Sequence, residues 1–213
     1  MDEKSQDGAK EILFVADPMC SWCWGFSPVI TAIDEATRDR ATITLVVGGL
    51  RPGTTETMDD GMKATIRHHW EEVGRASGQP FSFEFFGRDD FVYDTEPACR
   101  AAVTVRQLAP EATLPYFAAL HRAFYVDGED TTDPATLGRL AEGFGVDEDA
   151  FAKAFASEDM ARATVEDFQF SRRLGVTGFP TVMVNDSQGY ALLTAGFRSF
   201  EALQPNLDAW LES

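Results

Sequence analysis

The pattern of apolar and polar positions predicts a strand, a helix and a second strand at the start of the chain. Residues 11–17 form an apolar run that is typical of a buried strand and ends at the turn signal Asp17-Pro18. Apolar side chains then recur at helical spacing over 21–38, with Pro28 inside, where it removes a backbone donor and should kink the helix. The β-branched run 42–47 predicts the second strand.

Helical spacing dominates the middle of the chain. Phe81, Phe83, Phe85 and Phe86 alternate only in part, which leaves helix and strand both open for this segment. Their rings either belong to the core or form a wall beside a binding groove. Helices are predicted over 57–79, 95–108, 110–124, from 132 onward, over 147–157 and over 158–174, with the last one ending at Gly175.

The last forty residues return to strands. Residues 181–184 and 190–194 read as strands joined by a turn over 185–189, which predicts an antiparallel hairpin, and 200–211 as a final helix. The order is therefore strand, helix, strand, then a block of helices, then helix, strand, strand, helix. This order predicts an α/β domain from residues 1–56 and 165–213, interrupted by an inserted helical subdomain over 57–164.

Composition narrows the function classes. The chain has 213 residues, 44 % of them hydrophobic, which is enough for one large core. A net charge of −17 argues against nucleic acid as a partner, because the phosphate backbone would repel it. No apolar run is long enough to span a membrane, and residues 1–10 lack the apolar stretch of a signal peptide, so we expect a cytoplasmic protein.

The motif Cys20-Ser21-Trp22-Cys23 lies between the first predicted strand and the first predicted helix. Cysteines three residues apart in a helical turn share one face and can close a small disulfide ring. The partial positive charge of a helix N-terminus favours a thiolate at Cys20. This setting predicts a dithiol redox centre.

Two other interpretations of the cysteine pair are half of a zinc site and a pair of inert thiols. Zinc needs two further ligands at matching spacing. The remaining candidates are Cys99, the adjacent pair His68 and His69, and the lone helical His121, and none of them repeats such a spacing. We therefore expect no metal. Cys99 itself is either inert and buried or activated by its neighbour Arg100.

A second segment of interest is 176–181, which ends in Gly178-Phe179-Pro180-Thr181. Pro180 cannot donate to a strand ladder, so it must begin the strand or lie at its edge. A glycine and an aromatic residue before it favour a tight turn, in which a cis bond is plausible. An ordinary trans-proline loop is the alternative.

Together, segments 14–23 and 175–181 resemble the DsbA-like branch of the thioredoxin superfamily. The likeness is greatest to the bacterial DsbA-family group of predicted protein-disulfide isomerases and FrnE-like proteins. It covers essentially the whole chain, because this branch carries a helical insertion in the thioredoxin fold. The resemblance implies a central mixed sheet flanked by helices and a cis-proline, Pro180, that faces the disulfide with Phe179 before it.

The resemblance also implies thiol–disulfide exchange of the protein disulfide isomerase or reductase type. Cys20, at an exposed helix start, would attack the substrate, and the more buried Cys23, with the higher pKa, would resolve the mixed disulfide. We expect Trp22, Gly178, Phe179 and Pro180 to contact substrate, with the proline segment offering backbone to an extended chain. Substrates would be thiol- or disulfide-containing proteins or small molecules. No cofactor is expected beyond the redox-active disulfide, with glutathione as a candidate co-substrate.

Ser21 and Trp22 replace the proline–histidine pair of periplasmic DsbA and the glycine–proline pair of thioredoxin. For this reason we do not expect a strong oxidant. Kappa-class glutathione transferases and hydroxychromene-carboxylate isomerases resemble the same scaffold, but they carry serine where Cys20 stands. A non-catalytic binding module or redox adaptor is a further alternative. The physiological substrate, the direction of exchange, the redox potential and the oligomeric state are left open.

Overall fold

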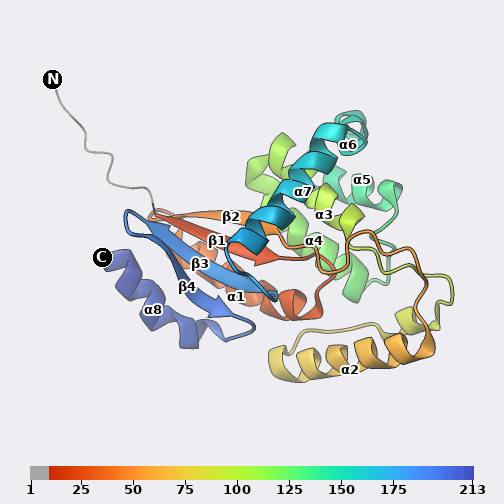
Figure 1. Cartoon of the computed structure of the whole chain (residues 1–213), viewed down its shortest axis with the longest axis horizontal. Coiled ribbons are helices and arrows are strands. Elements are labelled where there is room, and N and C mark those ends of the chain that lie inside the picture. Colours follow the sequence, from red (N-terminus) through yellow and green to blue (C-terminus); the bar gives the residue numbers. More distant parts are fainter. Residues whose placement is uncertain (1–9) are drawn as a thin grey trace.

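A computed structural model describes residues 10–213, so the prediction about a signal peptide concerns residues that lie almost wholly outside it. Its centre is a four-stranded mixed sheet in the order β2-β1-β3-β4 (Figure 1). β1 pairs in parallel with β2 and antiparallel with β3, and β3 pairs antiparallel with β4. The strands are β1 (Glu11–Ala16), β2 (Thr42–Val47), β3 (Thr181–Asp186) and β4 (Gly189–Ala195). The predicted α/β thioredoxin-type fold is confirmed.

Alternation along β1 explains how the sheet is covered on both faces. Successive side chains of a strand point to opposite faces. Ile12 and Phe14 pack in the main core, which also contains residues of α1 (Ser21–Thr37) and α8 (Phe200–Glu212). Leu13 and Val15 pack on the other face, against the C-terminal part of α7 (Glu158–Arg173). Figure 1 shows α7 crossing the sheet on the face opposite to α1.

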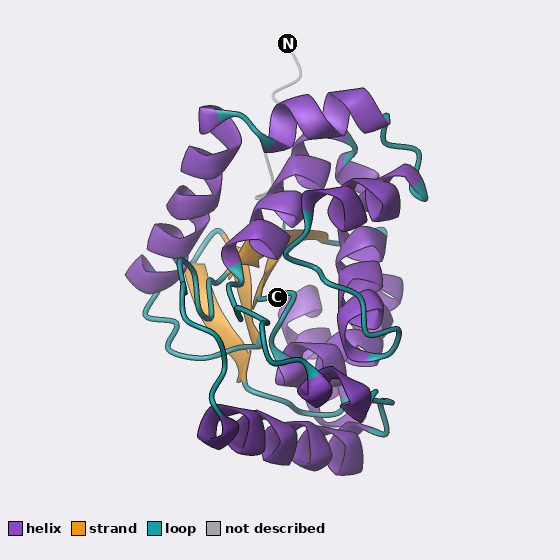
Figure 2. Cartoon of the chain, turned by 90° about the vertical axis from the view of Figure 1, so that its right-hand side faces the viewer, coloured by secondary structure: helices purple, strands orange, loops and turns teal. Residues whose placement is uncertain are grey.

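The helical block lies between β2 and α7 in the chain, as predicted. Figure 2 shows helices filling most of the molecule around the sheet. Aspartate side chains cap three of these helices, and a serine side chain caps α7, each by accepting a backbone N–H from the first turn, which explains where the helices begin. The block contains α2 (Asp60–Ser77), η1 (Phe83–Gly87), α3 (Glu96–Leu108), η2 (Pro110–Ala112), α4 (Thr113–Tyr125), α5 (Pro134–Glu142) and α6 (Glu148–Phe155).

Three predicted element bounds differ from the structure. The helix predicted over 110–124 is divided into the 3₁₀ turn η2 and α4. β3 runs to Asp186, so the hairpin turn is only Ser187 and Gln188, because Asn185 pairs with both neighbouring strands. The boundary predicted at residue 164 falls inside the continuous helix α7, and the division into two subdomains stays a prediction.

The phenylalanine segment forms neither a strand nor an α-helix. It makes a short 3₁₀ turn, η1, that brings Phe85 and Phe86 against Trp70 of α2. The ring centroids of these two residues lie 5.3 and 4.7 Å from that of the indole. Burial of the aromatic rings therefore decides the local backbone, and the interpretation as core residues is correct for this pair.

A charged pair covers the outer edge of β2. Arg106 of α3 and Asp167 of α7 form a two-pronged ion pair, with N–O distances of 2.7 and 3.0 Å. Arg106 also donates to Leu45 O, and Asp167 accepts from Val47 N at 3.0 Å. Because β2 is an edge strand, these backbone groups would otherwise lack partners. The pair thus joins the helical block to the strand that leads into the site described below.

We predict that Asp167→Ala lowers the free energy of unfolding by about 2 kcal/mol, because it removes the carboxylate partner of Arg106, which keeps only its bond to Leu45 O, and leaves the Val47 N–H without a partner. Chemical denaturation measures the loss. The control is Glu166→Ala on the same helix, whose exposed side chain should change stability by less than about 0.5 kcal/mol. Equal losses in the two variants would contradict a specific role for the pair.

Candidate functional site

The cysteine motif lies where β1 passes into α1. Cys20 is the N-cap residue, with extended backbone (φ −95°, ψ 115°), and its C=O accepts the N–H groups of Cys23 and Trp24 at 3.0 Å. The helix thus begins at Ser21 and places Cys23 in its first turn. The expectation of an exposed Cys20 was wrong, because the residue is only 6 % exposed, although Cys23 is fully buried. Cys20 is therefore the more accessible of two free thiols.

The segment around Pro180 faces this motif. The Phe179–Pro180 peptide bond is cis. The Cys20 thiol lies 3.6 Å from the carbonyl oxygen of Phe179 and donates to it. Pro180 is buried, whereas Gly178 is exposed. Two segments separated by about 160 positions in the sequence thus meet at the Cys20 sulfur.

The ring of Phe179 rests on Gly48, the residue directly after β2. A Cβ atom at position 48 would lie 2.1 Å from the ring, a distance that real Cβ atoms do not reach. Only glycine permits this approach. The end of β2 therefore sets the position of the segment that faces Cys20.

Trp22, inside the motif, packs against the segment that follows β4. Its half-buried ring lies 5.9 Å from that of Phe197, in the segment between β4 and α8. Of the predicted site residues, Cys20 and Phe179 thus meet directly, Cys23 lies beside Cys20, and Pro180 and Gly178 follow and precede Phe179 in the chain.

A buried carboxyl group, that of Asp17, lies beneath the motif. Its Oδ1 accepts from Met19 N at 2.8 Å, and its Oδ2 accepts from Leu50 N at 2.6 Å. The thiol of Cys99 is 3.4 Å from Oδ2, and the hydroxyl of Thr95 also donates to the carboxyl. Four donors from three parts of the chain thus compensate a charge that is fully removed from water.

Burial controls the protonation of this centre. It raises the pKa of Asp17 above its ordinary value, although the hydrogen bonds to Leu50, Met19, Thr95 and Cys99 oppose the shift. Burial also raises the pKa of Cys23 well above its ordinary value, and the neighbouring Cys20 thiol and the Asp17 charge raise it further. Cys23 is therefore held as a thiol.

His121 of α4 closes the site from the side of the helical block. Its Nε2 lies 3.3 Å from the Asp17 carbonyl oxygen, and its Nδ1 lies 3.2 Å from Ser27 Oγ. A carbonyl can only accept, so Nε2 carries the ring proton and Nδ1 accepts from the serine. Burial lowers the pKa of His121 to about 3, which keeps the ring neutral. This histidine is thus part of the site, whereas the sequence analysis treated it as a lone helix residue.

Cys99, Tyr93 and Tyr125 complete the buried surroundings of Asp17. Burial is the main cause that raises the pKa of Cys99 well above its ordinary value, and the Asp17 charge adds to it. The alternative that Arg100 activates this thiol is therefore wrong. The Tyr93 hydroxyl donates to Met19 O at 2.7 Å, while the buried hydroxyl of Tyr125 has no hydrogen-bond partner among the described residues.

Two cavities lie near the predicted binding residues. One, of about 390 Å³, runs alongside Phe179 and Gly178 between the end of α7 and β4. Its apolar lining includes Leu174, Val176, Met183 and Leu192. It therefore extends the site away from Cys20 along an exposed sheet edge.

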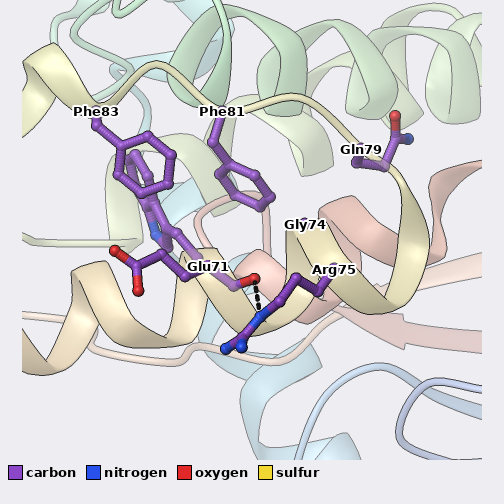
Figure 3. A pocket seen from close by; sticks show the side chains of 7 residues that line it. Glu71, Gly74, Arg75, Gln79, Phe81 and Phe83 are labelled. Carbon is purple, nitrogen blue, oxygen red and sulfur yellow. Dashed lines mark hydrogen bonds between the residues drawn. The ribbon is translucent and has the colours of Figure 1, made fainter.

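The other cavity, of about 500 Å³, lies between α2 and the segment that leads to η1. Figure 3 shows Phe81 and Phe83 pointing toward Glu71 and Arg75 of α2. Neither cysteine of the motif lines it. The expectation that these phenylalanines form a wall beside the cysteines therefore does not hold for Phe81 and Phe83, whose cavity is a separate one.

Other chemistry is not evident in residues 10–213. No group of three potential metal ligands comes together among them. His68 and His69 are exposed on α2, and His68 pairs with Glu72 at 3.4 Å. Within the same range, no helix combines the length and apolar character needed to cross a membrane.

The position of Asp17 in the site was not predicted, since its residue type and place before Pro18 indicate only a turn. The available clue was a carboxylate that directly follows an apolar strand and stands three residues before the first cysteine of the motif. No local pattern marks Tyr93 or His121, because each reaches the site only through the packing of α3 and α4.

Comparisons with known proteins agree with this geometry. The family model described as a DSBA-like thioredoxin domain matches residues 11–208. A crystal structure of a "putative protein disulfide isomerase" from Nitrosomonas europaea is 41 % identical, with a TM-score of 0.90 over 96 % of this chain and 98 % of that chain. The cytosolic disulfide reductase DsbM from Pseudomonas aeruginosa is 25 % identical, with a TM-score of 0.80 over 95 % and 98 %.

A curated relative, the ClpXP adapter protein SpxH of Halalkalibacterium halodurans, is 23 % identical over 87 % of this chain and 63 % of its own length. The SpxH of Shouchella clausii is 24 % identical over 83 % and 58 %. The chain thus spans about three fifths of the length of these two proteins.

We predict that Gly48→Ala lowers the rate of disulfide reduction by at least tenfold, because the new methyl group must displace the Phe179 ring. Insulin reduction with dithiothreitol measures the rate. Gly87→Ala is the matched control, since no atom lies within 4 Å of an added Cβ there. Equal rates in both variants would contradict the role of the Phe179 position.

We also predict that His121 destabilises the protein in acid. In the unfolded chain, His121 binds a proton below its ordinary pKa of 6.5, whereas in the folded chain it binds a proton only below about pH 3. The effect of His121 on the free energy of unfolding is therefore absent above pH 6.5. Between pH 6.5 and 3 it lowers that free energy as the pH falls, by about 1.4 kcal/mol per pH unit at most. Unfolding curves of His121→Gln should show a flatter pH dependence.

The exposed His69→Gln variant is the control for this titration and should keep the wild-type slope. Because the comparison concerns the slope, a constant loss of stability from the lost contacts does not affect it. A His121→Gln slope equal to that of the wild type would contradict the prediction.

Proposed function

The chain belongs to the DSBA-like thioredoxin domain family, and we propose that it is a thiol–disulfide oxidoreductase that reduces or rearranges disulfides through Cys20 and Cys23. The observation that carries the proposal is the contact between the Cys20 thiol and the Phe179 carbonyl, with the buried Cys23 one helical turn behind. In this arrangement Cys20 can react with the substrate first, and Cys23 can react afterwards with the mixed disulfide.

The first step is the attack of the Cys20 thiolate on a substrate disulfide. A mixed disulfide forms between Cys20 and one substrate sulfur, and the other substrate sulfur leaves as a thiolate. The greater exposure of Cys20 relative to Cys23 supports this assignment.

Cys23 then resolves the mixed disulfide. Its sulfur attacks the Cys20 sulfur, which closes the Cys20–Cys23 disulfide and releases the second substrate sulfur, and this leaving thiolate takes up the proton that Cys23 loses. Two electrons pass from the dithiol to the substrate. The raised pKa of Cys23 keeps it a thiol, a poor nucleophile, so Cys23 does not compete with Cys20 for the first attack.

The apolar cavity beside Phe179 is suited to bind the substrate. An extended segment could follow residues 177–179 toward the exposed edge strand β4 and place an apolar side chain against Leu174 and Leu192. Gly178 has no side chain to obstruct such a segment, and Trp22, packed against Phe197, lies next to Cys20 in the motif. This favours flexible or unfolded protein segments as substrates.

Reduction in the cytoplasm is the favoured direction and location. The name of the relative DsbM, a cytosolic disulfide reductase, supports both. A second structure of DsbM contains GSH, which supports glutathione as the thiol that returns the Cys20–Cys23 disulfide to the dithiol form. Two glutathione molecules would supply the two electrons and leave as glutathione disulfide.

An adaptor that binds one protein partner is a second candidate. The likeness to two SpxH proteins, which are named ClpXP adapters, favours it. It predicts a Cys20–Cys23 pair that can be oxidised but does not turn over a general disulfide substrate. A glutathione transferase or isomerase is disfavoured by the presence of Cys20, and retention on immobilised glutathione with activity toward an electrophilic aromatic compound would support it.

Insulin reduction with dithiothreitol distinguishes these candidates. We expect acceleration by the wild type, loss of at least a hundredfold with Cys20→Ser, and a trapped mixed disulfide with Cys23→Ser that mass spectrometry locates on Cys20. Cys99→Ser, which keeps both motif cysteines, is the matched control for the loss of a cysteine. Full activity of Cys20→Ser would refute the assignment, and an inactive wild type would favour the adaptor.

A further inference from the structure

The chain has a third buried cysteine that the exchange reaction does not use. Cys99 lies in α3, is fully buried, and its Sγ is 3.4 Å from Asp17 Oδ2. A thiol can donate its proton to a carboxylate, whereas a thiolate has no proton to donate and would repel the carboxylate. The contact therefore has one direction, from the Cys99 S–H to Asp17.

We propose that Cys99 is a positioning residue of the redox centre, whose S–H bond to Asp17 Oδ2 fixes the orientation of this carboxylate next to the cysteine motif, on the residue whose carbonyl oxygen accepts from Cys20 N. The inference rests on the function proposed above and extends it. Cys99 does not touch substrate, so it acts only through Asp17.

The hydrogen bonds at Asp17 explain why one more donor matters. Oδ1 accepts from Met19 N, whereas Oδ2 accepts from both Leu50 N and Cys99 Sγ. The backbone donors are unaffected by any side-chain exchange. Cys99 and Thr95 are therefore the donors through which α3 and the turn before it act on the carboxylate.

The charge on Asp17 is transmitted to the reactive pair. It is one of the causes that raise the pKa of Cys23, and the Cys99 bond is one of the causes that keep the pKa of Asp17 down. Without the Cys99 donor, Asp17 would take up a proton at higher pH. The influence of its charge on Cys23 would then begin at higher pH as well.

Several other titratable groups face Asp17 and must be considered in a pH experiment. His121 stays neutral above about pH 3, and burial raises the pKa values of Tyr93 and Tyr125, so these three groups do not titrate near neutrality. The remaining neighbours are Cys20 and Cys23 of α1, Arg51 after β2 and Glu96 of α3.

The test is the reduction potential of the Cys20–Cys23 pair in glutathione redox buffers between pH 4 and 9. In the wild type, the curve should bend where Asp17 titrates. In Cys99→Ala the bend should move upward by about half a pH unit, the low end of the range for one lost hydrogen bond, because a thiol is a weak donor. Cys99→Ser keeps a donor and should restore the wild-type curve.

A double-variant comparison tests whether Cys99 acts through Asp17. The curves of Asp17→Asn and of Asp17→Asn combined with Cys99→Ala should coincide. Cys99→Val replaces Cys99→Ala if the smaller side chain prevents folding. An unshifted bend in both donor-free variants, or a Cys99 effect that persists in Asp17→Asn, would overturn the inference.

The same measurement separates this inference from the proposed function. A wild type whose cysteine pair forms no reversible disulfide with glutathione would refute the function and with it the inference. A reversible disulfide whose curve ignores Cys99 would refute the inference alone.

Discussion

The structure depends on the burial of one carboxylate at the end of an apolar strand. Asp17 follows five buried residues of β1 and is itself removed from water. Burying an uncompensated charge would cost many times the stability of a domain. The chain meets this constraint by bringing Met19, Leu50 and Cys99 to the carboxylate. The Asp17 carboxylate thus connects three parts of the chain: the cysteine motif, the segment after β2, and α3.

This constraint links the two parts of the molecule. Cys99 and His121 come from the helical block, and the motif and Gly48 come from the sheet and its loops. The Arg106–Asp167 pair makes a second link at the edge of β2. The helical block between β2 and α7 therefore forms one wall of the candidate site, because Cys99 and His121 both contact Asp17.

The chemistry follows from unequal environments on one helical turn. Cys20 caps the helix beside an exposed loop, whereas Cys23 faces the buried carboxylate and remains a thiol. In the proposed reaction, the first thiol therefore meets the substrate and the second reacts only with the mixed disulfide. The apolar cavity is lined by Phe179, whose carbonyl oxygen accepts from the Cys20 thiol, so the proposed binding region adjoins the proposed reactive sulfur.

Sequence patterns with local causes were read correctly. Alternation and caps predicted the strands and most helix starts, and the resemblance of segments 14–23 and 175–181 predicted that these segments face each other, whereas the redox role of Cys20 and Cys23 stays a prediction. Features that depend on tertiary packing could not be predicted from the sequence. The 3₁₀ turn at 83–87 depends on packing around Trp70, and the low exposure of Cys20 depends on the Phe179 loop. Asp17 and His121 become site residues only because the ends of β1 and β2 pack against α3 and α4.

The most direct test of this account is a titration of the Asp17 carboxyl group by ¹³C NMR in the reduced and oxidised protein. The account predicts a midpoint above the ordinary value of 3.8 in the reduced form, and a different midpoint once the Cys20–Cys23 disulfide has replaced the two thiols. A midpoint at or below 3.8 that is the same in both forms would contradict it.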